Sequence, residues 1–152
     1  PITNFQYLFE NLMAFSLILM IANLLVVIVG IVVHGDLLIS PIKLFFIYTN
    51  FSFTAIGFSL AWFSLFRNKQ TANSVLNGVF VLMALMGGVM FPIQILPETF
   101  QRLAMMLPTY WLMESMLLII RGGGLRDYIL PLGIMLMFSF AFILLGSRRK
   151  IS

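Results

Sequence analysis

Residues 11–33 read NLMAFSLILMIANLLVVIVGIVV, a continuous apolar run that contains no charged side chain. Three further uncharged runs follow at Leu44–Phe66, Gln70–Pro97 and Tyr128–Ser147. Each reaches the roughly 20 residues that a helix needs to cross a bilayer. The runs do not alternate between apolar and polar residues, which excludes a transmembrane barrel. We therefore predict an all-α integral membrane protein with four transmembrane helices, over about residues 11–33, 43–66, 73–91 and 128–147.

The composition agrees with a chain that lies in lipid. Hydrophobic residues make up 61% of the sequence and charged residues 9%, and the mean hydropathy is +1.07. Soluble domains are about 25% charged, so a water-facing surface could not be built from these residues. The lipid bilayer is therefore the first partner that the sequence predicts.

The basic residues predict the orientation of the helices. Arg67 and Lys69 share one short loop, and Arg148, Arg149 and Lys150 lie together near the last residue. Clustered Lys and Arg favour the cytoplasmic side, and an even number of spans puts both clusters on one side. We expect a multi-pass protein of the cell membrane with both ends of this segment cytoplasmic. The basic residues act as topology anchors and form no patch for nucleic acid.

Prolines interrupt the chain between the third and fourth runs. Pro92, Pro97 and Pro108 each follow a large apolar residue, and the pieces between them are too short to span. We predict short helices over Pro97–Met106 and Thr109–Ile120, the second ended by Arg121 and three glycines. Both short helices would lie on the outer side of the membrane, where the third span ends and the fourth begins. This arrangement predicts a re-entrant two-helix hairpin over about residues 92–124, which dips into the outer leaflet.

Two sets of residues are candidates for a functional site. Polar side chains inside the spans could line a translocation path, although hydrogen bonding between packed helices is the alternative for each of them. Charged residues at membrane depth indicate function, and Glu114 and Arg121 are candidates for this reason. The alternative is a hairpin near the interface, where both charged groups would reach water. The path candidates are Asn23, Asn50, Thr54 and Asn77, and the outer-gate candidates are Pro92, Pro97, Pro108, Glu114 and Arg121.

No residue pattern predicts catalysis, a metal site or a bound cofactor. The single histidine, His34, lies beside Gly35 and Asp36, and we expect a solvated loop residue there. There is no cysteine, so a thiolate metal site is excluded. The three glycines at 122–124 lack the GK[ST] ending of a phosphate-binding loop. The sequence predicts a protein that is not an enzyme.

The segment from about Pro41 to Lys150 resembles the membrane subunits of ABC-2 type ABC transporters. Those permeases show a polar cytoplasmic loop, a helix ending in glycines, then Phe-Pro, Leu-Pro, a short helix, another Leu-Pro followed by aromatics, and an arginine. This order is repeated here by the loop at 66–73, Gly87 and Gly88, the pairs ending at Pro92, Pro97 and Pro108, Tyr110 and Trp111, and Arg121.

The resemblance implies six transmembrane helices per subunit and two subunits, identical or different, around one pathway. It implies separate ABC ATPase domains on the cytoplasmic side, which would bind and hydrolyse the ATP, so no cofactor is expected on this chain. The four predicted spans would be the last four, with the first two missing from this segment and Pro1–Glu10 the tail of a coupling region. Arg67 and Lys69 would then face the ATPase, and the hairpin would act as an outer gate.

Two other classes of function remain open from the sequence. A secondary transporter or channel subunit would use a discontinuous helix with convergent polar groups near the middle of the membrane. The hairpin could supply this, although few ionisable residues lie in the spans to couple an ion. A non-transport membrane scaffold is the second alternative. Dependence on a co-expressed ATPase would separate the ABC-2 type exporter from both.

Overall fold

The computed structural model describes residues 4–33 and 40–147, without the side chains of 4–9 and 11. These residues form α-helices, two short 3-10 turns and no strand. The predictions made for His34, Asp36 and the basic residues at 148–150 lie outside the described residues. The helices are α1 (Asn4–Val33), α2 (Pro41–Leu65), α3 (Lys69–Met86), α4 (Glu98–Ala104), α5 (Pro108–Ile120) and α6 (Ile129–Ser147), with η1 (Ile93–Ile95) before α4 and η2 (Leu125–Tyr128) before α6.

Three helical segments are long and apolar enough to cross a membrane: Leu12–Val33, Pro41–Leu65 and Leu125–Ser147. The predicted third span is not among them, so the count of four is not confirmed. Its helix, α3, has 18 residues, which corresponds to about 27 Å and is close to the thickness of a hydrocarbon core. Its first half is polar because Lys69, Gln70, Asn73 and Asn77 all fall there. Composition rather than length therefore separates α3 from the other three.

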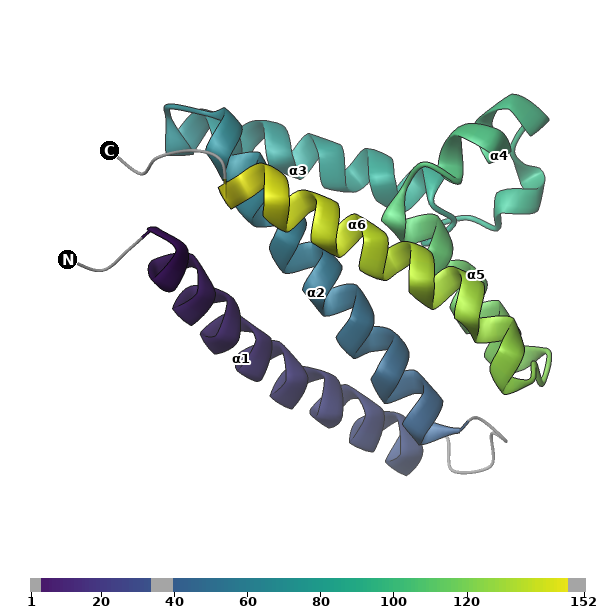
Figure 1. The fold of residues 1–152 in the computed structure, drawn as a ribbon. Coiled ribbons are helices and arrows are strands. Elements are labelled where there is room, and N and C mark those ends of the chain that lie inside the picture. The colour runs from purple at the N-terminus through teal and green to yellow at the C-terminus, as the bar shows by residue number, and fades with distance from the viewer. Residues whose placement is uncertain (1–3, 34–39, 148–152) are drawn as a thin grey trace.

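The helix ends sort into two groups (Figure 1). The beginnings of α1 and α3 lie at one end of the molecule with the ends of α2 and α6. The ends of α1 and α5 and the beginnings of α2 and α6 lie at the other end, where α4 also projects from the body. The loop containing Arg67 and Lys69 is therefore at the opposite end from the hairpin. The end of α6 lies at the same end of the molecule as this loop, and the cytoplasmic orientation stays a prediction.

The proline block folds into the two expected short helices. Pro97 is the N-cap of α4, and Pro108 occupies the first turn of α5, where its missing N–H costs nothing. The axes of α4 and α5 differ by 97°. Such an angle describes either a broken span or a re-entrant hairpin, so re-entry remains a prediction.

The helix pair with the most extensive contact is α2 with α6, whose ribbons cross in Figure 1. Glycines permit this approach: a Cβ atom added at Gly57 would lie 2.9 Å from the Ser139 carbonyl oxygen, and one at Gly146 would lie 3.1 Å from the Ala61 nitrogen. Small residues are what allows helices to pack tightly in lipid, where no hydrophobic driving force acts between them. The pair thus forms the frame of this segment.

Other elements are arranged around the α2–α6 pair. Ile119 of α5 packs with Ile47 of α2 and Tyr128 of η2 in a buried apolar cluster. In contrast, α1 presents most of its apolar side chains to the outside and buries only Ser16 and Val27 among its described side chains. A helix that is apolar on its exposed faces is suited to lipid contact.

Candidate functional site

Three of the four predicted path residues hydrogen-bond to a neighbouring helix. The Asn23 amide of α1 donates to the Ser52 hydroxyl of α2 at 2.9 Å. Asn50 donates to the carbonyl of Leu132 at 3.3 Å, and Thr54 donates to the carbonyl of Met135 at 2.9 Å, both from α2 to α6. These contacts match the interhelical alternative for those residues. A role for them in lining a path stays a prediction.

The fourth path candidate, Asn77, is separate from the other three. It is exposed on α3, and Gln70, Asn73 and Ser74 fall on the same stripe of the helix. The opposite side of α3 carries its buried residues, Ala72, Leu76 and Met83. The helix therefore turns a polar stripe away from the rest of the described chain.

A cavity of about 250 Å³ lies between the end of α3 and one face of α5. One wall is the turn that follows α3. The other wall is a face of α5 whose members are spaced i, i+3, i+4 and i+7, the spacing that aligns side chains along a helix. The lining residues are Gly87, Gly88, Val89, Met90, Phe91, Pro92, Ile93 and Gln94 from the turn, and Tyr110, Met113, Glu114 and Leu117 from α5.

Two glycines and a threonine fix the turn against α5. The Thr109 hydroxyl donates to the carbonyl of Met83, in the last turn of α3, at 2.9 Å. Gly87 makes room for this contact, because a Cβ atom added there would lie 2.0 Å from the Thr109 oxygen. Gly88 has φ +85°, a conformation in which a residue with a side chain is strained. The sequence showed these two glycines at the end of an apolar run, but the role of Thr109 carried no local signal.

The predicted outer-gate residues are not all in one place. Glu114 and Pro92 line the cavity, whereas Pro108 is buried at the beginning of α5 and Pro97 is exposed before α4. Arg121 is exposed and follows the last residue of α5. The ion pair found among the described residues joins Arg102 to Glu98 at 4.0 Å on the surface of α4, so Glu114 and Arg121 are not paired.

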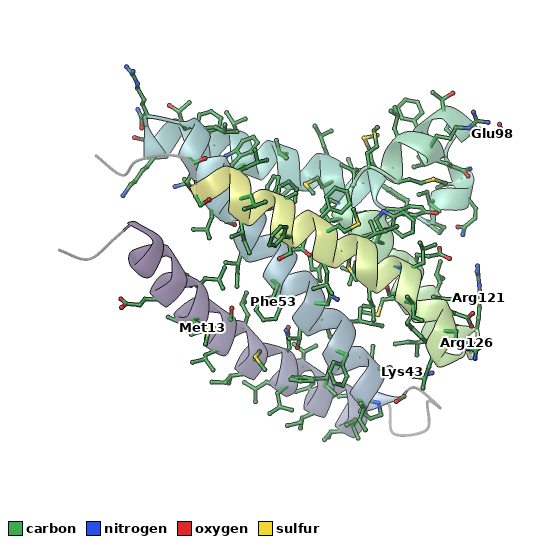
Figure 2. The ribbon with its side chains drawn as sticks, viewed as in Figure 1. Met13, Lys43, Phe53, Glu98, Arg121 and Arg126 are labelled. Atoms are coloured by element: carbon green, nitrogen blue, oxygen red, sulfur yellow. The ribbon has the colours of Figure 1, made fainter. Side chains whose placement is uncertain are left out.

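Lys43 is a contact residue that the sequence did not single out. Its Nζ atom donates to the Gly123 carbonyl at 3.0 Å and lies 4.9 Å from the centre of the Tyr128 ring. It thereby fastens the beginning of α2 to the loop between α5 and α6. Figure 2 shows Lys43, Arg121 and Arg126 at this same end of the molecule. One positive charge in the first turn of an apolar span was the only available signal.

At the opposite end, the side chains of Arg67 and Lys69 are exposed where α2 connects to α3. The Asn68 side chain accepts a hydrogen bond from the Gln70 N–H at 2.9 Å and so caps α3. The Trp62 indole donates to the Ala72 carbonyl at 3.0 Å, which holds the first turns of α3 against α2. Both cations are thus presented on a fixed turn. Among the residues described, no three potential metal ligands come together.

These features define a helical, multi-pass membrane protein. The comparison with known proteins then specifies the class. The profile of the family described as "ABC-2 family transporter protein" matches residues 1–148, and the chain belongs to that family. It is similar to "Putative transport permease YvfS" of Bacillus subtilis (strain 168), with 25% identity over 129 residues. No solved structure matches.

That similarity covers 82% of this chain but 51% of the Bacillus protein. The chain thus spans about half the length of the curated relative that it matches. The family and the apolar helices identify the membrane part of a transport permease. The resemblance expected from the polar loop, the glycines and the Leu-Pro pairs is confirmed.

Proposed function

We propose that this chain is part of the permease subunit of an ABC-2 type exporter and forms half of a translocation pathway. A partner ABC ATPase would bind and hydrolyse ATP, and a second permease subunit, identical or different, would complete the path. The observation that carries the proposal is the family match over nearly the whole chain. The three apolar helices and the polar stripe of α3 are compatible with it.

The arrangement of the two ends supports a direction for the subunit. The exposed cations Arg67 and Lys69 lie at the end of the molecule shared by the beginning of α1 and the end of α6. We place this end at the cytoplasmic side, against the ATPase, because short basic loops favour that side. The hairpin, with its cavity, would then be the outer gate. ATP would be used by the partner, and this chain would carry no catalytic group.

The first experiment is to purify the full-length parent protein with and without its ATPase, reconstitute both in lipid, and measure co-purification and ATP hydrolysis. A stable complex that hydrolyses ATP supports the proposal. Failure of the intact, folded parent to associate contradicts it and favours a channel, a secondary transporter or a scaffold.

A pair of double variants tests the assignment of the two ends. Arg67→Ala with Lys69→Ala removes two exposed charges from the proposed ATPase side, and Arg121→Ala with Arg126→Ala removes two from the opposite end. We expect the first pair to weaken co-purification of the ATPase several-fold and the second to leave it unchanged. The reverse result would place the ATPase at the hairpin end.

A further inference from the structure

The cavity between α3 and α5 contains one carboxyl group, that of Glu114, which forms no ion pair with a described residue. Glu114 is half-buried in its wall. No described residue forms an ion pair with it, since the recorded pair joins Arg102 to Glu98. Nor does any described group donate a hydrogen bond to its carboxylate. Lys43 is engaged elsewhere, with the Gly123 carbonyl and the Tyr128 ring.

Glu114 is directed to the cavity by the two-sided packing of α5. One side of this helix buries Ser115 and Ile119 against the body of the protein. Glu114 lies on the opposite side, in line with Tyr110 and Leu117. Rotating the carboxylate into the packed side would bury a charge among apolar groups, which is strongly unfavourable. The fold therefore holds this charge in the cavity.

Apart from Gln94, the other side chains of the lining are apolar or aromatic. Phe91 of the turn and Tyr110 of α5 supply two rings, and Met90 and Met113 supply thioethers. Aromatic faces attract cations, and methionine adapts its shape to apolar ligands. A carboxylate with aromatic and thioether neighbours is therefore complementary to a ligand that is positively charged and largely apolar.

A metal ion is a poorer match for the same walls. Calcium requires about six to eight oxygen ligands, and magnesium retains most of its water. Glu114 is the one carboxylate in the lining, and the turn and α5 offer mostly hydrocarbon beside it. An organic ammonium ion carries weakly hydrated alkyl or aryl groups, so it loses less hydration free energy than a metal ion on leaving water.

Access and size are also suitable. The glycines at the inner part of the cavity, Gly87 and Gly88, are buried, whereas Val89, Met90 and Phe91 at its rim are exposed. The volume of about 250 Å³ lies just below the range of roughly 300–1,000 Å³ found for small-molecule sites. A ligand the size of one substituted aromatic ring can enter from the rim.

We propose that this cavity binds a monovalent organic cation, with the charge beside Glu114 and the apolar part against Phe91 and Tyr110. The binding does not depend on an ATPase. Its use as a step in export, with organic cations as the substrate class, rests on the proposed function.

Binding is tested with the full-length parent protein in lipid nanodiscs without ATPase, using benzyltrimethylammonium as the probe and titration calorimetry as the measurement. The variant Glu114→Gln keeps the shape of the side chain and removes its charge. The matched control is Glu98→Gln, which removes the same charge from α4, where the side chain is 89% exposed and outside the cavity. Thermal unfolding of all three proteins verifies that they are folded.

We expect the wild type and Glu98→Gln to bind the probe equally and Glu114→Gln to bind it about ten-fold more weakly or worse. Neopentylbenzene, the uncharged carbon analogue, should lack this dependence on Glu114. Equal binding by Glu114→Gln and the wild type would overturn the proposal, as would no binding to the folded wild type, or displacement of the probe by micromolar calcium. Because ATPase association is measured separately, the permease assignment can fail while this site stands, or the reverse.

Discussion

Helices α6 and α3 both pack on α2, but they are held in different ways. Contacts between α2 and α6 run along the pair, from Asn50 and Thr54 to the close approach at Gly57. In contrast, α3 is hydrogen-bonded near its two ends, by Trp62 to the Ala72 carbonyl and by Thr109 to the Met83 carbonyl. Much of its surface between these points is exposed.

The difference separates a frame from an element that can accept a new neighbour. The α2–α6 contact uses polar groups and glycines on both helices, so a shift along it would break several contacts together. The middle of α3 has few contacts to lose, and its polar stripe at Asn73 and Asn77 has no described partner. In the proposed permease, the side chains of this stripe would hydrogen-bond to water in the path or to the second subunit. The following substitutions test this division.

The largest effect is expected at Gly57. Gly57→Ala adds a methyl group 2.9 Å from the Ser139 carbonyl oxygen, so α2 and α6 must separate. We expect a loss of about 2–3 kcal/mol in unfolding free energy, measured by denaturation of the detergent-solubilised parent. The control is Gly133→Ala in α6, where the added atom meets nothing within 4 Å and alanine favours the helix. Equal stability of the two variants would refute the tight packing of the pair.

A second substitution acts at the end of α3. Gly87→Ala would displace Thr109, whose hydroxyl oxygen lies 2.0 Å from the position of the new atom. The new atom would also lie 2.6 Å from the Met83 carbonyl oxygen. We still expect a smaller loss than at Gly57, about 1–2 kcal/mol, with faster proteolysis at 87–97, because a turn at the end of a helix can shift more easily than two helices packed along their length. Gly78→Ala is the matched control, because nothing lies within 4 Å of that position in the same helix. Unchanged proteolysis of Gly87→Ala would show that Thr109 does not secure this end.

The third test concerns the polar contacts of the α2–α6 pair. Thr54→Val removes the donor to the Met135 carbonyl, and buried bonds of this kind contribute about 0.6 kcal/mol on average in membrane proteins. Thr49→Val is the control, since the buried Thr49 hydroxyl has no hydrogen-bond partner among the described residues and its removal should be neutral or stabilising. Thr49→Val should therefore have a higher free energy of unfolding than Thr54→Val. The opposite order would mean that the 2.9 Å bond contributes nothing.

An effect of similar size is expected at the beginning of α3. Trp62→Phe removes the indole donor to the Ala72 carbonyl but retains an aromatic ring beside Phe58 and Phe66. We expect a loss of about 0.5–1 kcal/mol and faster hydrogen exchange in residues 69–76. Trp111→Phe breaks a similar bond, to the Met105 carbonyl within the hairpin, and should leave that exchange unchanged. Similar exchange in both variants would contradict the anchoring role of Trp62.

The sequence predicted the positions of the helices better than it predicted which helices pack together. Uncharged runs and prolines were enough to place the apolar helices and to predict the beginning of α5 at Thr109, one residue after its observed first residue, Pro108. The pairing of α2 with α6 was not predictable, because each is apolar on nearly every side and so carries no signal for which face is packed. The third span is not confirmed, because Gln70, Asn73 and Asn77 are uncharged but make the first half of α3 polar.

The candidate site was predictable in part for a related reason. Glu114 stood out as an acid in an apolar helix, and it does line a cavity. The other wall required the conformation at Gly88 and the contact of Thr109 with a backbone carbonyl 26 residues earlier. Neither can be read from local spacing. The polar residues of the spans showed the reverse limitation, because side chains that could line a path are equally suited to join helices.

The hydrogen bonds from α2 to α6 also have a consequence for biosynthesis. Asn50 bonds to a carbonyl that lies 82 residues later in the chain, and Thr54 to one 81 residues later. At roughly 5–20 residues per second, the ribosome needs on the order of 10 s to supply those partners. Until then the Thr54 hydroxyl can donate to the Asn50 carbonyl of its own helix, at 3.3 Å, whereas the Asn50 amide lacks its described acceptor. We therefore expect the Asn50 amide to be hydrogen-bonded by water, by the insertion machinery or by another polar helix until α6 is inserted.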